Sequence, residues 1–323
     1  MTDLKIEVER RIAANGLAVA REAIAGYAIR TPLLPFSTEG GREVRIKPEC
    51  LQPYGSFKVR PAANVLADYS DAELAGGVAC PSAGNFGQGL AYAASRRGVR
   101  LTVHAPDKAA QVKLDVMRGL GAMVHVHPFD EWWRIMTTRE TGADDGLFVH
   151  PVCESGVVLG NGTIGLEIAE DWPEADTVVV PVGGGGLISG IALALRSLGH
   201  KARVVACEVD TAAPLGRAFA AGEPVTVQRQ PSFVDGIGST RVLDEMWPLL
   251  RDLVDEVVTV SVADAERGVR MAANQSHLVV EGAAGVALAA AHSPSLAGQR
   301  VVAVVSGGNI DHAELCRILA AKP

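Results

Sequence analysis

The chain has 323 residues, a hydrophobic fraction of 48% and a formal net charge of -7. A chain of this length can bury a large core, and the length favours two lobes over one small module. The acidic balance excludes the basic surface that nucleic acids and anionic membranes attract, so we expect a small-molecule partner. The N-terminal residues MTDLKIEVERR carry charges where a secretory signal needs an apolar run, which indicates the cytoplasm.

Short apolar runs rich in β-branched residues alternate with helical patterns rich in alanine and leucine. This alternation predicts an α/β fold of mostly parallel sheets flanked by helices. We expect buried strands at 77–82, 100–106, 122–128, 177–183, 203–209 and 301–308, and helices at 86–97, 108–119, 162–171, 187–198 and 281–292. The uncharged stretch 177–195 nearly reaches the length of a membrane helix, but Pro181 and four consecutive glycines favour a strand, a turn and a helix. The irregular segment 220–240 is typical of a long loop that lines a site.

Two motifs place polar side chains where a helix begins. In GSFKV, Lys58 precedes a helical pattern, and the positive end of the helix dipole favours the neutral amine that a Schiff base requires. In PSAGNFG, a strand ends at Ser82, and the glycines allow a turn whose free N–H groups can bind a carboxylate. Taken singly, the two motifs also suit a solvated surface lysine and an ordinary strand-to-helix connection.

Two further motifs follow apolar strands. In VPVGGGGLISG, Gly183 to Gly186 open a helix, so that backbone N–H groups can enclose a phosphate. The motif lacks the lysine and hydroxyl of a Walker loop, while Glu208 leaves a dinucleotide-binding interpretation open. In VVAVVSGGNID, Ser306 stands at the carboxyl end of a strand, where ligands bind in open α/β sheets, although the segment also suits a plain turn.

Together and in this order, the four motifs resemble the fold-type II pyridoxal-phosphate enzymes, in particular the serine/threonine dehydratase (threonine ammonia-lyase) and serine racemase branch. The resemblance runs from Thr31 to Ser306 and includes the segments HPVCESGVVLGNGTIGLEI, VDGIG and VVEGAAGVALAA. It implies a tryptophan synthase β-like architecture of two α/β domains, with residues 1–47 and 155–323 in a large cofactor domain and residues 48–154 in a small domain. It also implies a homodimer.

The resemblance assigns a role to each matching residue. Lys58 would be the catalytic residue and would bind pyridoxal 5'-phosphate covalently, while Phe57 would flank the cofactor ring. Further cofactor contacts would come from Asn85 at the ring hydroxyl, Ser306 at the ring nitrogen, Gly183, Gly184, Gly185, Gly186 and Leu187 at the phosphate, and Gly236 and Glu281. The carboxylate of an amino-acid substrate would be bound by Ser82, Ala83, Gly84 and Asn85.

The implied activity is that of a pyridoxal-phosphate-dependent lyase, which converts serine, threonine or a related β-hydroxy amino acid to a 2-oxo acid and ammonia. The alternatives are a racemase or a β-replacement enzyme on the same fold, and a non-catalytic nucleotide-binding α/β protein. Ala83 stands where racemases of this branch carry a serine as second proton donor, and an alanine methyl has no exchangeable proton. Val59 stands where the cysteine synthase group usually has an acidic residue.

Three departures from the family pattern bear on metal binding and on the substrate. Members that bind a divalent cation use a glutamate like Glu208 and an acidic residue several positions later, where this chain has Pro214, so we expect no metal site. Phe86 stands where the branch often has histidine, which leaves the substrate open. The adjacent Trp132 and Trp133 lie in an expected helix, where packing or subunit contact is favoured over substrate contact.

Overall fold

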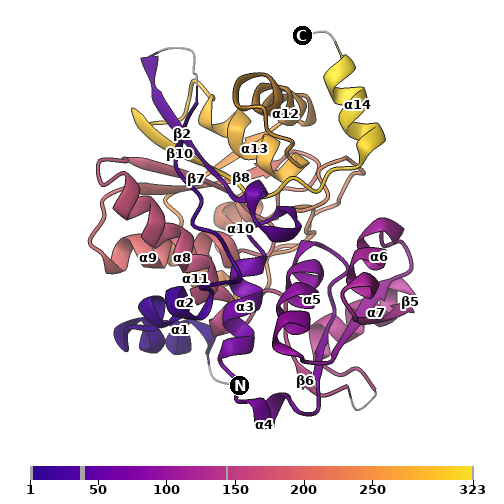
Figure 1. Cartoon of the computed structure of the whole chain (residues 1–323). Helices are drawn as coiled ribbons and strands as arrows, with labels where there is room; N and C mark the ends of the chain where they lie inside the picture. Colours follow the sequence, from indigo (N-terminus) through magenta and orange to yellow (C-terminus); the bar gives the residue numbers. More distant parts are fainter. Residues whose placement is uncertain (1–2, 37–40, 143–144, 322–323) are drawn as a thin grey trace.

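A computed structural model describes residues 3–36, 41–142 and 145–321, whose strands form two sheets (Figure 1). The large sheet has six strands in the order β1-β2-β10-β7-β8-β9, and the small sheet has four in the order β5-β4-β3-β6. Neighbouring strands are parallel throughout, apart from the antiparallel pair β1 and β2. The strands are β1 (Leu34–Phe36), β2 (Glu43–Pro48), β3 (Val78–Cys80), β4 (Leu101–Pro106), β5 (Met123–His127), β6 (Leu147–Phe148), β7 (Thr177–Pro181), β8 (Arg203–Val209), β9 (Glu256–Val260) and β10 (Arg300–Val305).

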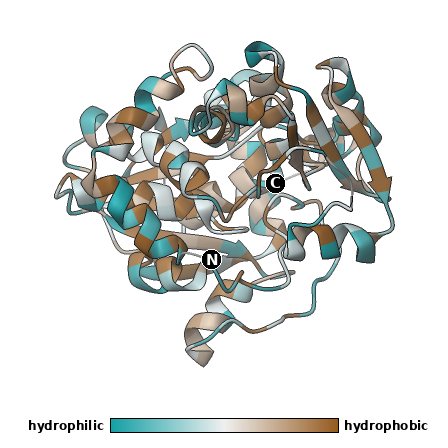
Figure 2. Cartoon of the chain, turned by 90° about the horizontal axis from the view of Figure 1, so that it is seen from below, coloured by the Kyte–Doolittle hydropathy of each residue, from teal (hydrophilic) through white to brown (hydrophobic). Residues whose placement is uncertain are grey.

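Helices cover both faces of the large sheet, because its strands turn alternate side chains to opposite sides. Val178 and Val180 pack on the side of α8, α9 and α11, whereas Val179 packs on the side of α12, α13 and α14. Helices at the surface carry both hydrophilic and hydrophobic residues, as helices with one buried face do (Figure 2), whereas α13 is apolar and buried along its whole length. The helices are α1 (Leu4–Ala13), α2 (Gly16–Ala23), α3 (Val59–Ala67), α4 (Asp71–Leu74), α5 (Asn85–Arg97), α6 (Gln111–Gly119), α7 (Phe129–Thr138), α8 (Ser155–Asp171), α9 (Gly186–Ser197), α10 (Pro214–Ala221), α11 (Trp247–Leu253), α12 (Val262–Ser276), α13 (Gly282–Ala291) and α14 (His312–Ala320).

The expected α/β class and parallel sheets are confirmed, and so is the strand, turn and helix within 177–195. The five expected helices correspond to α5, α6, α8, α9 and α13. The expectation that every strand is buried was wrong for β5, where Met123, His125 and Val126 are exposed because β5 is the edge of the small sheet. Among the described residues, no helix combines the length and the apolar composition that crossing a membrane requires.

Helices α8 and α9 approach each other closely through glycines. A Cβ atom on Gly190 would lie 2.4 Å from the carbonyl oxygen of Val158 and 2.7 Å from the backbone nitrogen of Gly162. Real Cβ atoms do not approach other atoms this closely, so a side chain on Gly190 would push the helices apart. Helix α8 is therefore seated directly against the first turns of α9, and Asn161 lies at this contact.

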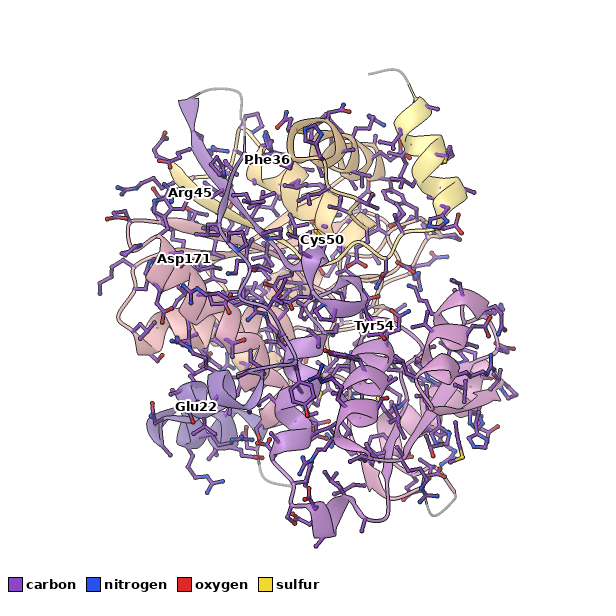
Figure 3. All side chains as sticks on the ribbon, in the orientation of Figure 1. Glu22, Phe36, Arg45, Cys50, Tyr54 and Asp171 are labelled. Atoms are coloured by element: carbon purple, nitrogen blue, oxygen red, sulfur yellow. The ribbon has the colours of Figure 1, made fainter. Side chains whose placement is uncertain are left out.

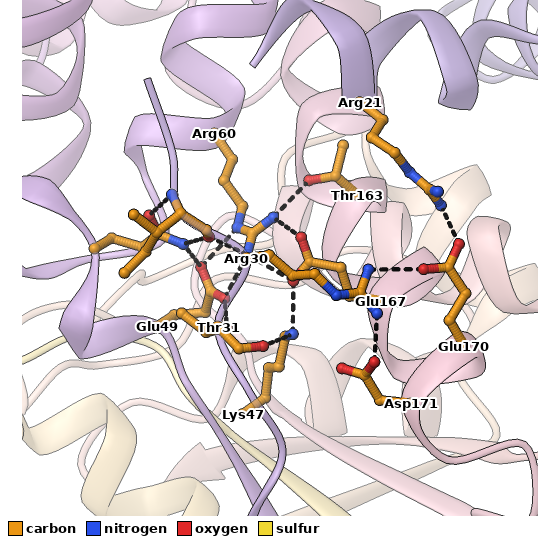
Figure 4. Close-up of polar contacts among 12 residues, drawn as sticks. Arg21, Arg30, Thr31, Lys47, Glu49, Arg60, Thr163, Glu167, Glu170 and Asp171 are labelled. Carbon is orange, nitrogen blue, oxygen red and sulfur yellow. Dashed lines mark hydrogen bonds and ion pairs between the residues drawn. The ribbon is translucent and has the colours of Figure 1, made fainter. Parts of the chain in front are cut away.

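A buried cluster of charges holds α3, the helix that lies between α8 and α5 (Figures 1 and 4). Arg60 and Lys47 are fully buried. The Arg60 guanidinium donates to Glu49 at 2.8 Å and to Glu167 at 2.7 Å, and Lys47 Nζ donates to Glu167 at 2.6 Å. Two cations thus face two anions in the interior, and each charge is hydrogen-bonded, as buried charges must be to be tolerated. We call Arg60, Lys47, Glu49 and Glu167 the buried ion cluster.

We predict that Arg60→Met lowers the free energy of unfolding by about 3 to 5 kcal/mol, because it leaves Glu49 and Glu167 with Lys47 as their remaining buried cation. Urea denaturation followed by circular dichroism measures the loss. The matched control is Arg251→Met, which removes a largely exposed arginine paired with Asp252 at 2.9 Å and should cost less than about 1 kcal/mol. Equal losses in the two variants would contradict this account.

Candidate active site

A cavity of about 370 Å³ is lined by residues from both sheets and their connecting segments. All the site residues expected from the sequence line it, except Ala83: Phe57, Lys58, Ser82, Gly84, Asn85, Gly183, Gly184, Gly185, Gly186, Leu187, Gly236, Glu281 and Ser306. The side chain of Ala83 instead packs against the core of the small sheet. The structure thus brings together residues as far apart in the sequence as Phe57 and Ser306.

The cavity lies at the carboxyl ends of strands from both sheets. Ser306 directly follows β10, the glycine run Gly183–Gly186 follows β7, and Ser82 follows β3. The carboxyl ends of parallel strands, with the helix N-termini that come after them, are where α/β proteins bind ligands. The irregular segment between α10 and α11 also reaches the cavity, through Asp235, Gly236 and Ile237, as expected.

Lys58 caps the N-terminus of α3 and turns its ammonium group into the cavity. Its Nζ atom lies 4.8 Å from the centre of the Phe57 ring and 5.7 Å from that of Phe86. Burial lowers the pKa of Lys58 to about 8, against an opposing effect of Glu281. The sequence analysis expected a lowered pKa but attributed it to the helix dipole, whereas loss of solvent is the larger cause. Lys58 is therefore poised to act as a neutral amine near physiological pH.

Backbone hydrogen bonds tie the segment before Lys58 to the segment after β10. Ser56 and Gly307 form an antiparallel bridge, and Phe57 N donates to Ser306 O at 3.0 Å. Gly55 has φ +71°, and a Cβ atom there would lie 2.7 Å from Asn309 Oδ1, so this turn needs glycine. The GSFK and SGGN motifs are thus hydrogen-bonded to each other, and this pairing holds Lys58 near Ser306.

Asn309 was not expected to contribute to the site, yet its side chain joins three segments. Its Nδ2 atom donates to the carbonyl oxygen of Tyr54 at 2.8 Å and to Asn85 Oδ1 at 3.0 Å. Tyr54, labelled in Figure 3, has left-handed backbone geometry with φ 58°. The position of Asn309 directly after the two glycines of SGGN was the available signal, because an amide beside a tight turn often bonds to neighbouring backbone.

Glu281 connects two residues to which the sequence gave separate roles. Its carboxylate accepts a hydrogen bond from Asn85 Nδ2 at 2.9 Å and one from Ser306 Oγ at 3.1 Å. Burial raises the pKa of Glu281, and the bonds from Asn85 and Ser306 oppose the rise. The three side chains form one polar wall of the cavity. The other charged residues among the described lining residues are Lys58, Lys113 and Asp235.

The glycine run presents backbone in place of side chains. A Cβ atom on Gly184 would lie 2.6 Å from Val152 Cγ2, and Gly185 has φ +92° at the N-terminus of α9. Side chains there would clash or strain the backbone, and their absence leaves N–H groups free to face an anion. This arrangement is the one that the sequence predicted for a phosphate.

Asn161 is a second residue that the sequence analysis missed. It is 1% exposed and lines the cavity, and neither its amide nitrogen nor its amide oxygen has a hydrogen-bond partner. Its Nδ2 atom lies 3.4 Å from where a Cβ atom of Gly186 would stand. Buried polar atoms without partners are costly, so their position beside the glycine run marks a place where a polar ligand binds. The signal was a polar residue in the otherwise small and apolar run GVVLGNG.

A family model described as pyridoxal-phosphate dependent enzyme matches residues 24–307. The L-threonine ammonia-lyase of Thermotoga maritima is 38% identical over 284 residues, which are 86% of this chain and 70% of that protein. The catabolic L-threonine dehydratase of Escherichia coli is 32% identical over 323 residues, 98% of each chain. The structure of maize serine racemase superposes with a TM-score of 0.86 at 30% identity, covering 94% of this chain and 95% of that one.

The chain therefore belongs to the pyridoxal-phosphate-dependent enzyme family, with the fold-type II architecture, and its cofactor is pyridoxal phosphate. The residues present fit this cofactor. A lysine with a lowered pKa, a glycine run at a helix N-terminus and the unpartnered amide of Asn161 provide an amine for its aldehyde and donors for its phosphate.

Glu208, which the sequence compared with a metal ligand of the family, is engaged by backbone. Its two carboxylate oxygens accept hydrogen bonds from Leu215 N and Gly216 N, both at 2.9 Å, at the start of α10. Burial raises its pKa to about 6. Among the described residues, no group of three histidine, cysteine or acidic side chains is placed to hold a metal ion. The expectation that this chain binds no metal there stays a prediction.

We predict that cofactor uptake by the apoprotein becomes faster as the pH rises, with a midpoint near the Lys58 pKa of about 8. Below that pH the ammonium form predominates, and it has no lone pair with which to attack the cofactor aldehyde. Stopped-flow measurement of the visible absorption between about pH 6 and pH 11.5 gives the midpoint. A midpoint at about 10.4, the value of a solvated lysine, would show that burial does not tune Lys58.

We predict that Asn161→Ala weakens cofactor binding about tenfold to a hundredfold, the worth of a hydrogen bond to a charged group. Titration of the apoprotein with pyridoxal phosphate measures the affinity. Thermal unfolding of the apoprotein should not be impaired, because the variant removes unpartnered polar atoms. Thr102→Val is the control, since Thr102 Oγ1 is also buried and unpartnered but does not line the cavity. Unchanged affinity in Asn161→Ala would rule out this contact.

Proposed function

We propose that the protein is a lyase that eliminates water from a β-hydroxy amino acid such as serine or threonine. The enamine product then takes up water and releases ammonia, which leaves a 2-oxo acid. The observation that carries the proposal is the lysine of lowered pKa, Lys58, which faces a cavity shared with the glycine run and Ser306. The ammonia-lyase and dehydratase relatives support this reaction over the others known on the fold. Family membership as an enzyme excludes the alternative of a non-catalytic nucleotide-binding protein.

Each residue of the site has a task in this reaction. When bound, pyridoxal phosphate supplies an electron sink for the charge that develops at the α-carbon of the substrate. Lys58 Nζ would hold the cofactor covalently and would be the base that takes the α-proton of the substrate. The N–H groups of the turn after Ser82 orient the substrate carboxylate, and Gly183–Gly186 with Leu187 anchor the phosphate.

Ser306 and Glu281 set the electronic character of the site. A neutral hydroxyl at the ring nitrogen of the cofactor does not force its protonation, as a carboxylate would, so the electron sink stays moderate and elimination is favoured over transamination. Ser306 Oγ donates to Glu281 here, and Asn85 shares the same carboxylate. The serine hydroxyl has one proton, so it would turn from Glu281 to bond an unprotonated ring nitrogen. Phe57 and Gly236 bound the remaining space for the ring.

Elimination without racemisation is the expected outcome at the α-carbon. Racemisation needs proton donors on both faces of the planar carbanion, and Lys58 serves one face. Ala83 cannot serve the other, because its methyl group has no exchangeable proton and packs against the core of the small sheet. Relatives of this chain include serine racemases, so the distinction rests on this position.

We also infer that the enzyme is a cytoplasmic homodimer that binds no nucleic acid, with residues 1–47 and 155–323 as the cofactor domain and 48–154 as the small domain. The net charge of -7 supports the absence of nucleic-acid binding. The composition of the two sheets supports the division, because the strands of the small sheet lie between residues 78 and 148. Light scattering of the holoenzyme measures the assembly.

We predict that Lys58→Ala abolishes both the visible absorption of the bound cofactor and the release of 2-oxo acid from L-serine and L-threonine. No other lysine lines the cavity among the described residues except Lys113, which is paired with Asp235. A coupled assay for 2-oxo acids measures turnover, and Lys108→Ala at an exposed position is the control. Substantial turnover by Lys58→Ala would refute the role given to Lys58.

A further inference from the structure

Helix α7 contributes a wall of the cavity that none of these roles uses. Trp132 and Met136 lie four residues apart, which places them on one face of the helix, and both line the cavity. Trp133 lies on another face: it is 42% exposed, and its ring is stacked on Phe129 with centroids 6.4 Å apart. The two adjacent tryptophans therefore differ, because Trp132 lines the cavity and Trp133 does not.

The substrate has one group for which the site described so far provides no contact. The cofactor occupies the glycine run and the polar wall, the turn after Ser82 takes the carboxylate, and Lys58 takes the α-proton. The substituent on the β-carbon remains. Other apolar side chains line the same cavity, among them Phe86 and Val157, which are 2% and 0% exposed. An apolar substituent would be removed from water there, which favours its binding.

The charges of the cavity argue against an acidic substituent. Lys58 and Lys113 are the cations among the described residues that line it. Lys58 is committed to the cofactor, and Lys113 Nζ donates to Asp235 Oδ2 at 3.2 Å. A second carboxylate would enter without a free cation and beside Asp235 and Glu281, which makes its desolvation costly. The favoured substrate therefore carries one carboxylate.

Trp132 also carries a hydrogen-bond donor that no described protein group uses. Its indole Nε1 atom is buried and has no partner. Buried indole N–H groups usually find an acceptor, and the bound substrate carries one near its β-carbon, the hydroxyl oxygen. A donor at this oxygen would also assist its departure, because it stabilises the charge that develops there as the carbon–oxygen bond breaks.

We propose that Trp132 and Met136 form the subsite for the β-carbon of the substrate. This subsite selects monocarboxylic β-hydroxy amino acids with an apolar β-substituent, the methyl group of threonine or a larger one, over serine. Trp132 Nε1 donates to the β-hydroxyl. The inference rests on the proposed lyase function and adds the class of substrate to it.

The test compares kcat/KM of the holoenzyme for L-threonine and L-serine in matched variants. Trp132→Ala and Met136→Ala should each lower the threonine-to-serine ratio about tenfold, because they remove the apolar contact with the methyl group. Trp132→Phe keeps an apolar ring but loses the donor, so it should lower both constants and leave the ratio unchanged. The control Trp133→Ala alters a neighbouring exposed tryptophan and should change neither constant.

A ratio that stays at the wild-type value in both alanine variants, with cofactor absorption and thermal midpoint retained, would overturn the subsite. So would an equal change in Trp133→Ala. Binding of the unreactive L-valine and L-alanine, followed by the change in cofactor absorption, tests the same wall without turnover: Trp132→Ala should weaken valine more than alanine. If wild-type holoenzyme prefers valine in this way but releases no 2-oxo acid, the proposed function fails and the subsite stands.

Discussion

The guanidinium of Arg60 is bound from two directions, by Glu49 in the turn after β2 and by Glu167 in α8, and it is the charge around which α3 is positioned. Opposite charges without solvent attract strongly and tolerate little displacement, because any gap leaves a buried charge unpaired. Arg60 lies two residues after Lys58 in the sequence, so the ion pairs of Arg60 also fix the start of α3, which carries Lys58. Proton transfer at a substrate carbon depends on placement within a fraction of an ångström, and a rigid helix start provides it.

The segment before Lys58 is held by backbone hydrogen bonds rather than by ion pairs. The bridge between Ser56 and Gly307 and the bond from Phe57 N to Ser306 O align the lysine with the end of β10. Helix α8 carries both Glu167, in the buried ion cluster, and Asn161, beside the glycine run. Helix α8 therefore contacts both the glycine run and the ion cluster behind Lys58. Its close packing against α9 keeps the distance between these two parts of the site fixed.

The sequence predicted the glycine run, Lys58, Ser82, Asn85 and Ser306 correctly as cavity residues, because strand ends and helix starts are marked by local patterns. It missed Asn161 and Asn309, whose importance depends on neighbours distant in the chain. It also could not separate Trp132 from Trp133, since the phase of a helix relative to a cavity is a tertiary property. The edge strands β1, β6 and β9 were not recognised either, because edge positions weaken the apolar signal. The inner strand β2 was missed because charged residues alternate with its apolar ones.

The order of strands in the large sheet affects how the chain can fold while it is being synthesised on the ribosome. β2 spans residues 43 to 48, yet its parallel partner β10 spans residues 300 to 305 and is the last strand of the described residues. A growing chain that lacks β10 leaves an edge of β2 and the adjacent edge of β7 unpaired, and it also lacks Ser306. Such non-local pairing is slow and exposes strand edges in the meantime. The complete cavity, which includes Ser306, therefore forms only after β10 has left the ribosome.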